Sequence, residues 1–302
     1  MTLKTEEIQF NSQGVRLAAA FLKPAGRTPK GGWPCVVMAH GLGGTRAAGL
    51  MPFAEHFAAA GLAVLVFDYR GFGLSAGEPR QVVDVKMQLA DWAAAIANAR
   101  SRSEVNPQRI ALWGSSFSGG LVIAAGVADG RVAAISSQGG MLDGLAAVQQ
   151  LVKAAGPVHM AKVTALAALD AARAKLGLSR ITLPVVGAPG SMAALTTPDS
   201  LPGYTRITPP EWVNAISLSW MLTIALFRPN VLAAQLHCPV LFCIATDDAV
   251  VPPSAVEDAA RRAGDKAEVV RYQRGHFEIY VDEGFADSAR DQTAFFLRHL
   301  KR

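Results

Sequence analysis

A serine, an aspartate and a histidine follow three strand-like segments of the chain, in that order. Ser116 lies in Trp-Gly-Ser-Ser-Phe-Ser-Gly-Gly, where an apolar run breaks into small residues before a helix start. Asp248 follows the apolar run 239–245, and His276 lies in Arg-Gly-His-Phe beyond the last such run. A serine hydroxyl is a weak nucleophile near neutral pH, so it needs a nearby base and usually a carboxylate that orients this base. The three residues predict attack by serine on a carbonyl group.

The segment around Ser116 fits a sharp turn from strand to helix. Such a nucleophile elbow holds the serine at its tip with Oγ exposed, and small neighbours let the backbone pack tightly. The pattern is Gly-x-Ser-x-Gly, except that Ser118 stands where the second glycine is expected. A Gly/Ser cluster between a strand and a helix is also typical of an ordinary turn. The choice between the two therefore depends on the rest of the chain.

The elements that must position these residues alternate along the chain. Apolar runs at 8–10, 15–22, 34–39, 62–67, 110–113, 132–136, 239–245 and 267–272 predict strands, the first two as an antiparallel hairpin. Helical patterns lie at 47–60, 82–99, 117–127 and 284–300. This order predicts an α/β fold with a mostly parallel, doubly wound sheet that helices cover on both faces.

Between Asp143 and Asn230 the alternation stops. The segment is rich in alanine and leucine, is interrupted by prolines, and offers one weak strand at 183–186. We expect a mainly helical cap insertion at 143–230 on a core formed by 1–142 and 231–302. Its larger apolar residues could form a core of their own or roof an apolar pocket: these are Trp212, Trp220, Met221 and Phe227. The apolar window 213–227 is too short to span a bilayer, and a cap or core helix is expected there.

With these motifs together, the chain resembles the α/β-hydrolase family over nearly its whole length. Ala-His-Gly-Leu-Gly-Gly at 39–44 is similar to the family's His-Gly oxyanion loop, and Phe-Asp-Tyr-Arg-Gly at 67–71 is similar to a scaffold segment. The family often closes its acid loop with an acid, two residues, an aliphatic position or threonine, and a proline. Asp248 fits this spacing with Pro252, and Asp247 is the reserve candidate.

The resemblance implies an eight-stranded sheet and a role for each motif residue. Ser116 would be the nucleophile, His276 the base and Asp248 the acid that orients it. The backbone N–H groups of Leu42 and Phe117 would form the oxyanion hole. The resemblance also makes His40 a structural organiser of the oxyanion loop rather than a base.

The expected reaction is hydrolysis of a carboxylic ester or an acyl thioester, since both acylate serine by the same route. A peptidase or amidase of the proline-releasing type is the first alternative, and it usually needs a polar group that fixes a substrate amine. The segment 143–230 holds only four acids, which favours an apolar acyl group: Asp143, Asp170, Asp199 and Glu211. A ligand-binding protein without catalysis is the second alternative, because a fold alone does not establish function.

Composition argues against several other classes. The chain has 302 residues, 51% of them hydrophobic, and its formal net charge of +5 is dispersed without a basic tract interleaved with aromatics. We therefore expect one sizeable core, a small-molecule substrate and no nucleic-acid partner. No metal or other cofactor is expected, since Cys35, Cys238 and Cys243 lie in apolar runs and no His and carboxylate cluster has metal spacing. The N-terminus resembles no export signal, so we expect a cytoplasmic protein; its oligomeric state is open.

Overall fold

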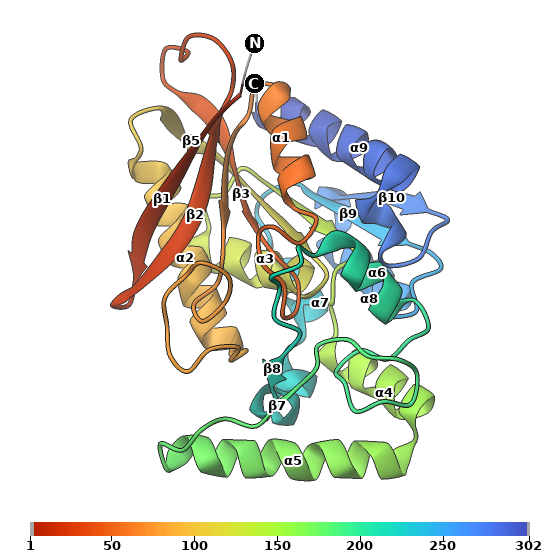
Figure 1. Ribbon diagram of the computed structural model, residues 1–302. Helices are drawn as coiled ribbons and strands as arrows, with labels where there is room; N and C mark the ends of the chain where they lie inside the picture. The colour runs from red at the N-terminus through yellow and green to blue at the C-terminus, as the bar shows by residue number, and fades with distance from the viewer. Residues whose placement is uncertain (1–2, 301–302) are drawn as a thin grey trace.

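An eight-stranded sheet forms the centre of the computed structural model, which describes residues 3–300 (Figure 1). Its spatial order is β1-β2-β4-β3-β5-β6-β9-β10. The strands are β1 (Lys4–Ser12), β2 (Val15–Lys23), β3 (Trp33–Ala39), β4 (Ala63–Phe67), β5 (Val105–Ser115), β6 (Ala134–Gln138), β9 (Val240–Ala245) and β10 (Ala267–Tyr272). Only the β1–β2 and β2–β4 pairs of this sheet are antiparallel. The predicted eight-stranded, mostly parallel sheet is confirmed.

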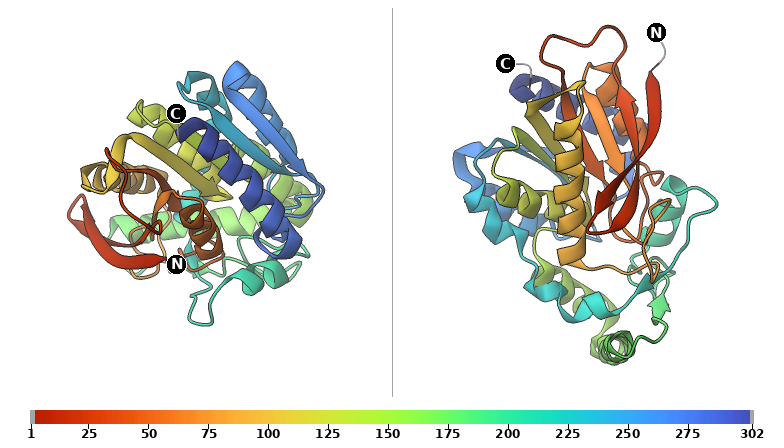
Figure 2. Two further views of the ribbon diagram at one scale, coloured as in Figure 1. Left: turned by 90° about the horizontal axis from the view of Figure 1, so that it is seen from above. Right: turned by 90° about the vertical axis from the view of Figure 1, so that its left-hand side faces the viewer.

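Helices cover both faces of this sheet (Figures 1 and 2). On one face lie α1 (Met51–Ala59) and α9 (Asp282–Leu300), and on the other lie α2 (Val85–Ser101), α3 (Phe117–Asp129) and α8 (Pro253–Ala263). Every residue of β3, β4, β6 and β9 is buried, as is typical of parallel strands between two helical layers. The sheet is thus a firm support for the loops that leave its strand ends.

Most predicted elements are present, with shifted ends. The strand expected at 110–113 extends over all of β5, and the helix expected at 47–60 begins only at Met51. Turn hydrogen bonds hold the preceding residues instead, among them the one from the Gly49 N–H to the Ala47 carbonyl. The sequence reasoning missed α8. Its buried residues recur at helical spacings, so the periodic signal was present in the sequence: these are Ala255, Val256, Ala259, Ala260 and Ala263.

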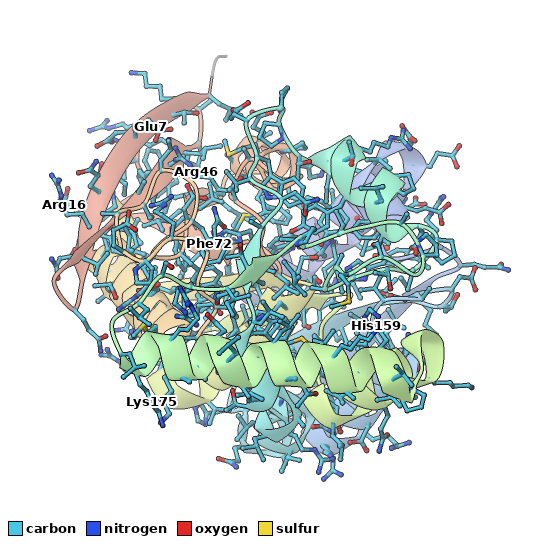
Figure 3. All side chains as sticks on the ribbon, turned by 60° about the horizontal axis from the view of Figure 1, so that its bottom comes forward. Glu7, Arg16, Arg46, Phe72, His159 and Lys175 are labelled. Atoms are coloured by element: carbon cyan, nitrogen blue, oxygen red, sulfur yellow. The ribbon has the colours of Figure 1, made fainter. Side chains whose placement is uncertain are left out.

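Helices make up most of the regular structure of the segment 143–230. It contains α4 (Gly144–Ala155), α5 (Pro157–Lys175) and α6 (Ser200–Ile207), and α7 (Pro229–Leu232) begins at its end. Its short strands β7 (Thr182–Leu183) and β8 (Ile216–Ser217) pair antiparallel. In Figure 1, α5 lies below the other helices, and in Figure 3 it crosses the front with His159 and Lys175 toward opposite ends. The division of the chain into a core and a separate cap stays a prediction.

The prediction of a helix within 213–227 was wrong. The structure describes all of these residues and gives them β8 and two 3-10 turns, Ser219–Leu222 and Ile224–Leu226. The buried carboxylate of Asp170 accepts hydrogen bonds from the N–H groups of Leu218 and Ser219 at 3.2 and 2.9 Å. A side chain thus satisfies backbone donors here, and a helical ladder is not needed. Among residues 3–300, no helix is long and apolar enough to cross a membrane.

Candidate active site

Ser116 lies at the tip of a sharp turn between β5 and α3. Its backbone has φ 56° and ψ −122°, a region that residues other than glycine rarely adopt. A Cβ atom at Gly114 would lie 2.2 Å from the Ser118 carbonyl oxygen, so only glycine fits there. The side chain of Ser116 remains partly exposed. The strand, the turn and the helix of the predicted elbow are therefore all present.

The structure brings the three predicted residues together. Nε2 of His276 lies 3.1 Å from Oγ of Ser116, and Nδ1 of His276 lies 2.6 Å from Oδ2 of Asp248. The other carboxylate oxygen, Oδ1 of Asp248, accepts hydrogen bonds from the N–H groups of Val250 and Val251 at 2.8 and 2.7 Å. These two bonds fix the carboxylate and leave Oδ2 for the imidazole. The arrangement is that of a serine, a base and an orienting acid.

Electrostatics in this site favour a proton on His276. Burial of the imidazole opposes its charged form, but the charge of Asp248 and its hydrogen bond outweigh burial, so the pKa of His276 is raised above 6.5. A raised pKa makes the free Nε2 a stronger base toward the serine hydroxyl. Asp247, the reserve acid, is exposed and accepts instead from the Thr246 hydroxyl at 3.5 Å. Of the two acids, Asp248 is the one that bonds to the imidazole.

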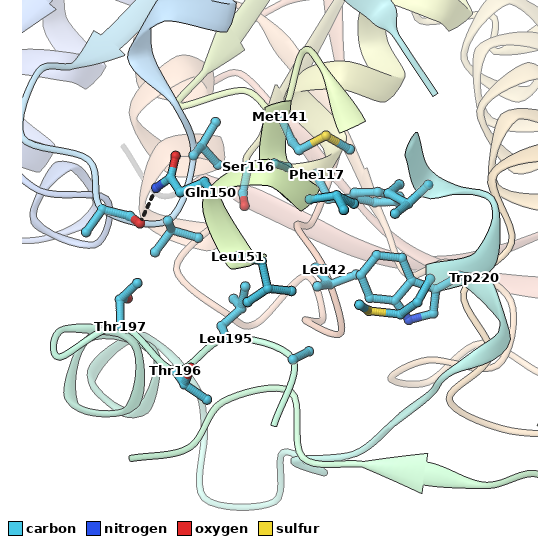
Figure 4. Close-up of a pocket in the computed structure, with 18 residues that line it drawn as sticks. Leu42, Ser116, Phe117, Met141, Gln150, Leu151, Leu195, Thr196, Thr197 and Trp220 are labelled. Atoms are coloured by element: carbon cyan, nitrogen blue, oxygen red, sulfur yellow. Dashed lines mark hydrogen bonds between the residues drawn. The ribbon is translucent and has the colours of Figure 1, made fainter. Parts of the chain in front are cut away.

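An apolar pocket opens beside Ser116 (Figure 4). Its interior is narrow, with a volume of about 110 Å³. The lining comes both from the sheet side and from the insertion, and includes Leu42, Phe117, Met141, Val148, Leu151, Leu195, Trp220, Met221 and Ile224. Part of the insertion therefore roofs an apolar pocket. Phe227 packs on Phe117, with ring centroids 6.0 Å apart.

The loop 40–44 follows β3 and approaches Ser116 closely. A Cβ atom at Gly41 would lie 2.9 Å from Cβ of Ser116, and Gly43 has φ +66° with a side chain of Val185 directly against it. Leu42 and Phe117 both line the pocket with Ser116. The Phe117 N–H is the first of α3 and has no helical partner of its own. The two residues that are expected to supply the oxyanion donors thus line the same pocket as the serine.

His40 orients the peptide that carries the Leu42 N–H. Nδ1 of His40 donates to the Gly41 carbonyl at 2.9 Å, and Nε2 accepts from the Tyr69 N–H at 3.4 Å, a pattern that assigns the neutral tautomer with a proton on Nδ1. Burial lowers the pKa of His40 although the charge of Asp68 opposes this shift. Because the Gly41 carbonyl and the Leu42 N–H share one planar peptide, His40 fixes the direction of that N–H.

Comparisons with known proteins identify the family of the chain. The family model described as serine aminopeptidase, S33, matches residues 32–184. Over 294 residues, 97% of this chain and 94% of the relative, the chain is 39% identical to quorum-quenching protein AidA of Acinetobacter baumannii (strain MDR-ZJ06). The crystal structure of the α/β hydrolase GrgF from Penicillium sp. sh18 shares the fold, with a TM-score of 0.81, 24% identity, and coverage of 99% of this chain and 100% of that one.

The chain belongs to the α/β-hydrolase family. It is a serine hydrolase by this membership. A shorter match relates the hydrolase to thiohydrolase aneE of Aspergillus aculeatus (strain ATCC 16872 / CBS 172.66 / WB 5094), with 40% identity over 104 residues, 34% of this chain and 33% of the relative. The family model ends before Asp248 and His276, so the elbow lies inside the match and the acid and base lie outside it.

Two acids of the hydrolase's insertion serve its folding. Asp143 caps α4 and pairs with Arg228 at 2.9 Å, and Asp170 pairs with Arg180 at 2.6 Å. Asp199 is partly buried, and Glu211 is exposed. In the described part of the chain, no group of three or more His, Cys, Asp or Glu side chains is arranged to hold a metal ion.

Sequence reasoning missed four polar side chains around the hydrolase's loop 40–44. Ser118 donates to the His40 carbonyl and lies 2.6 Å from the Tyr69 hydroxyl. Its place at the expected glycine was a signal that it has a role of its own. Tyr204 and Trp212 bond the same loop across separations of 162 and 169 residues, so no local pattern could reveal them.

Proposed function

We propose that this hydrolase cleaves carboxylic esters with an apolar acyl group, through an acyl-enzyme on Ser116. The observation that carries this proposal is the hydrogen-bonded series from Ser116 through His276 to Asp248, with its serine at the mouth of an apolar pocket. His276 acts as the base, and Asp248 orients it.

In the first half of the reaction, the Ser116 Oγ attacks the ester carbonyl carbon while its proton moves to Nε2 of His276. Asp248 holds the proton on Nδ1, so Nε2 is free to accept, and its charge stabilises the imidazolium that forms. The N–H groups of Leu42 and Phe117 stabilise the oxyanion, and removing such a donor typically costs roughly 3 kcal/mol of transition-state stabilisation.

The tetrahedral intermediate then collapses. The bond to the alcohol oxygen breaks, His276 returns its proton to that oxygen, and the acyl group stays on Ser116 as an ester. In the second half, His276 takes a proton from a water molecule, whose oxygen attacks the acyl carbon. Collapse of the second intermediate releases the carboxylic acid and restores the serine hydroxyl.

An apolar acyl group is the part of the substrate that the pocket favours. Its lining is dominated by leucine, valine, isoleucine, methionine and aromatic side chains, with Gln150 turned to the Ala249 carbonyl at 2.6 Å. Burial of each methylene contributes about 0.8 kcal/mol of binding. The same acyl group can arrive as a thioester, which differs only in its leaving group, and one relative is named a thiohydrolase.

The proline-releasing peptidase or amidase is the competing reaction, and the matched family model carries an aminopeptidase description. The pocket at Ser116 has no carboxylate among its lining residues within the described chain, so it offers no charged partner for a substrate amine. This favours esters over aminoacyl amides.

A matched substrate series tests the proposal. The kcat/KM of purified protein is measured with the p-nitrophenyl ester, the thioester and the p-nitroanilide of butyric acid, and with proline p-nitroanilide. We expect the ester and thioester to exceed both anilides by at least about 100-fold. Preference for proline p-nitroanilide would replace this function with the peptidase, and no turnover of any acyl compound would favour the binding protein.

A further inference from the structure

Two aromatic side chains of the insertion hold the backbone of the loop 40–44. The hydroxyl of Tyr204, in α6, donates to the Leu42 carbonyl at 2.6 Å. Nε1 of Trp212, which follows α6, donates to the Gly43 carbonyl at 2.8 Å. Both bonds reach the two peptide groups that come directly after the Leu42 N–H.

The hydrogen bonds from Tyr204 and Trp212, together with two from the core, fix four successive carbonyl groups of the loop 40–44. Ser118 donates to the carbonyl of residue 40, and the imidazole of His40 donates to the carbonyl of residue 41. Each carbonyl from residue 40 to residue 43 therefore has a side-chain donor. Half of these donors come from the sheet side and half from the insertion.

The two aromatic side chains support one another. The rings of Tyr204 and Trp212 stack with centroids 4.8 Å apart and an interplanar angle of 22°. Tyr204 also packs edge-on against Phe277, the neighbour of His276, with centroids 5.7 Å apart. The Tyr204 side chain is buried, and burial raises its pKa, so the hydroxyl keeps the proton that it donates.

The loop needs such support because of its glycines. Gly41, Gly43 and Gly44 give it wide backbone freedom, and Gly43 already adopts a positive φ. A donor to an oxyanion is effective only when its direction is fixed before charge develops, because a donor that must reorganise loses most of its effect. Fixing the carbonyls on either side of Leu42 fixes this direction.

We propose that Tyr204 and Trp212 are positioning residues that hold the Leu42 N–H in place for the oxyanion. This inference rests on the proposed function of Ser116 and Leu42. It gives the insertion a part in the chemical step, in addition to its contribution to the pocket.

The test uses substitutions that remove one donor and keep an aromatic ring, Tyr204→Phe and Trp212→Phe. For each we expect kcat for a p-nitrophenyl ester to fall about tenfold with KM changed less than about twofold, since misplacement of a catalytic group by about 1 Å can cost up to 100-fold. The affinity for a trifluoromethyl ketone should fall by the same factor as kcat, because its adduct with Ser116 places an oxygen in the oxyanion hole.

Tyr272→Phe is the matched control. Tyr272 is as buried as Tyr204, and its hydroxyl donates to Asp291 at 3.1 Å, away from the loop 40–44. We expect kcat and ketone affinity of this variant to stay within about twofold of the wild type, whatever stability it loses. Thermal unfolding is measured to check that each of the three variants is folded. If Tyr204→Phe does not fold, the test rests on Trp212→Phe alone.

Unchanged kcat and ketone affinity in the folded variants, or a rise of KM alone, would overturn the proposal. Unfolding of both variants would assign the two side chains to folding alone and would overturn it as well. A failure of the proposed function gives a different result. The wild-type protein would then form no ketone adduct, and any ester hydrolysis that it showed would persist in Ser116→Ala.

Discussion

The hydroxyl of Ser118 donates a hydrogen bond to the carbonyl of His40, so the start of α3 is tied to the loop 40–44. A hydroxyl has one proton, and the Tyr69 hydroxyl must therefore donate to Ser118, at 2.6 Å, while Nε1 of Trp92 donates to Tyr69 at 2.7 Å. All four residues are buried. The serine that replaces the expected glycine thus joins the two segments that carry Phe117 and Leu42.

Ser118→Ala should reduce both stability and catalysis. It removes the side-chain donor to the His40 carbonyl and leaves the Tyr69 hydroxyl proton without its acceptor, which typically costs about 1–3 kcal/mol of unfolding free energy. Because the His40 carbonyl begins the loop 40–44, kcat should also fall, by about tenfold. Urea unfolding and ester kinetics measure the two effects.

Ser137→Ala is the control for this substitution. Ser137 is equally buried and donates to the Gly119 carbonyl at 2.9 Å, on the side of α3 that faces β6. It should lose stability while kcat stays within about twofold of the wild type. Equal kcat losses in Ser118→Ala and Ser137→Ala would contradict the role that we give to Ser118.

Activity should depend on pH through His276. The reaction needs a neutral imidazole, and its pKa is raised above 6.5, so kcat/KM should increase with pH and reach half its plateau above pH 6.5. Asp248→Asn removes the charge that raises this pKa. The midpoint should therefore move to lower pH, and kcat should fall by up to about 10⁴-fold, the loss that this substitution causes in a Ser-His-Asp protease.

Asp247→Asn is the control for the acid. The carboxylate of Asp247 is exposed and does not contact the imidazole within the described contacts, so both the pH midpoint and kcat should stay close to those of the wild type. A larger loss of kcat in Asp247→Asn than in Asp248→Asn would make Asp247 the acid that orients His276.

Chain order, residue type and the family resemblance singled out three side chains that the structure brings together. A serine after one strand, an acid after a later one and a histidine after the last converge because β5, β9 and β10 run parallel and end at the same edge. The small residues around Ser116 and the glycines of 40–44 were equally informative, since each close approach there leaves no room for a Cβ atom.

The insertion was predicted less well because its structure depends on distant partners. Asp170 bonds backbone groups of residues 218 and 219, which prevents a helix that the apolar composition alone favours. In the sequence, Trp212 is counted among the apolar residues and Tyr204 is not singled out, although the polar atoms of both bond to the loop 40–44. A sequence pattern records local periodicity and cannot show such contacts.

Asp170→Asn should destabilise the protein. Asp170 is fully buried and Arg180 is partly buried, and breaking a buried pair costs up to about 3–5 kcal/mol of unfolding free energy. Burial opposes ionisation of Asp170, but the hydrogen bonds of Arg180 and of backbone N–H groups outweigh it and lower the pKa below 3.8. A lowered pKa stabilises the folded state above the unfolded-state value, and this contribution is lost as pH falls.

Urea unfolding at pH 7 and at pH 3 measures this effect. The difference between wild type and Asp170→Asn should be large at pH 7 and smaller at pH 3. Asp282→Asn provides a comparison, because Asp282 pairs with Arg206 at the surface, where both side chains are more than half exposed, and should contribute less than about 1 kcal/mol. A difference for Asp170→Asn that grows toward pH 3 would contradict the account.

Trp220→Ala should change the acyl-chain preference. The indole lines the pocket and packs against Phe117 with ring centroids 6.3 Å apart, so its removal lengthens the space beside Ser116. The chain length with the highest kcat/KM should shift upward by two or more methylenes, at about 0.8 kcal/mol each. Leu222→Ala, on the same 3-10 turn but exposed, should leave the preference unchanged. The same shift of the preferred chain length in both variants would show that the acyl group does not bind beside Trp220.

Covalent labelling of Ser116 tests the central claim most directly. The intact mass of the protein is measured after reaction with a fluorophosphonate, which phosphonylates a serine only when a base activates it. We predict one added group on Ser116 in the wild type and in Ser115→Ala, and none in folded Ser116→Ala, which should also lose ester hydrolysis. Labelling and full hydrolysis that persist in Ser116→Ala would show that another residue performs the reaction.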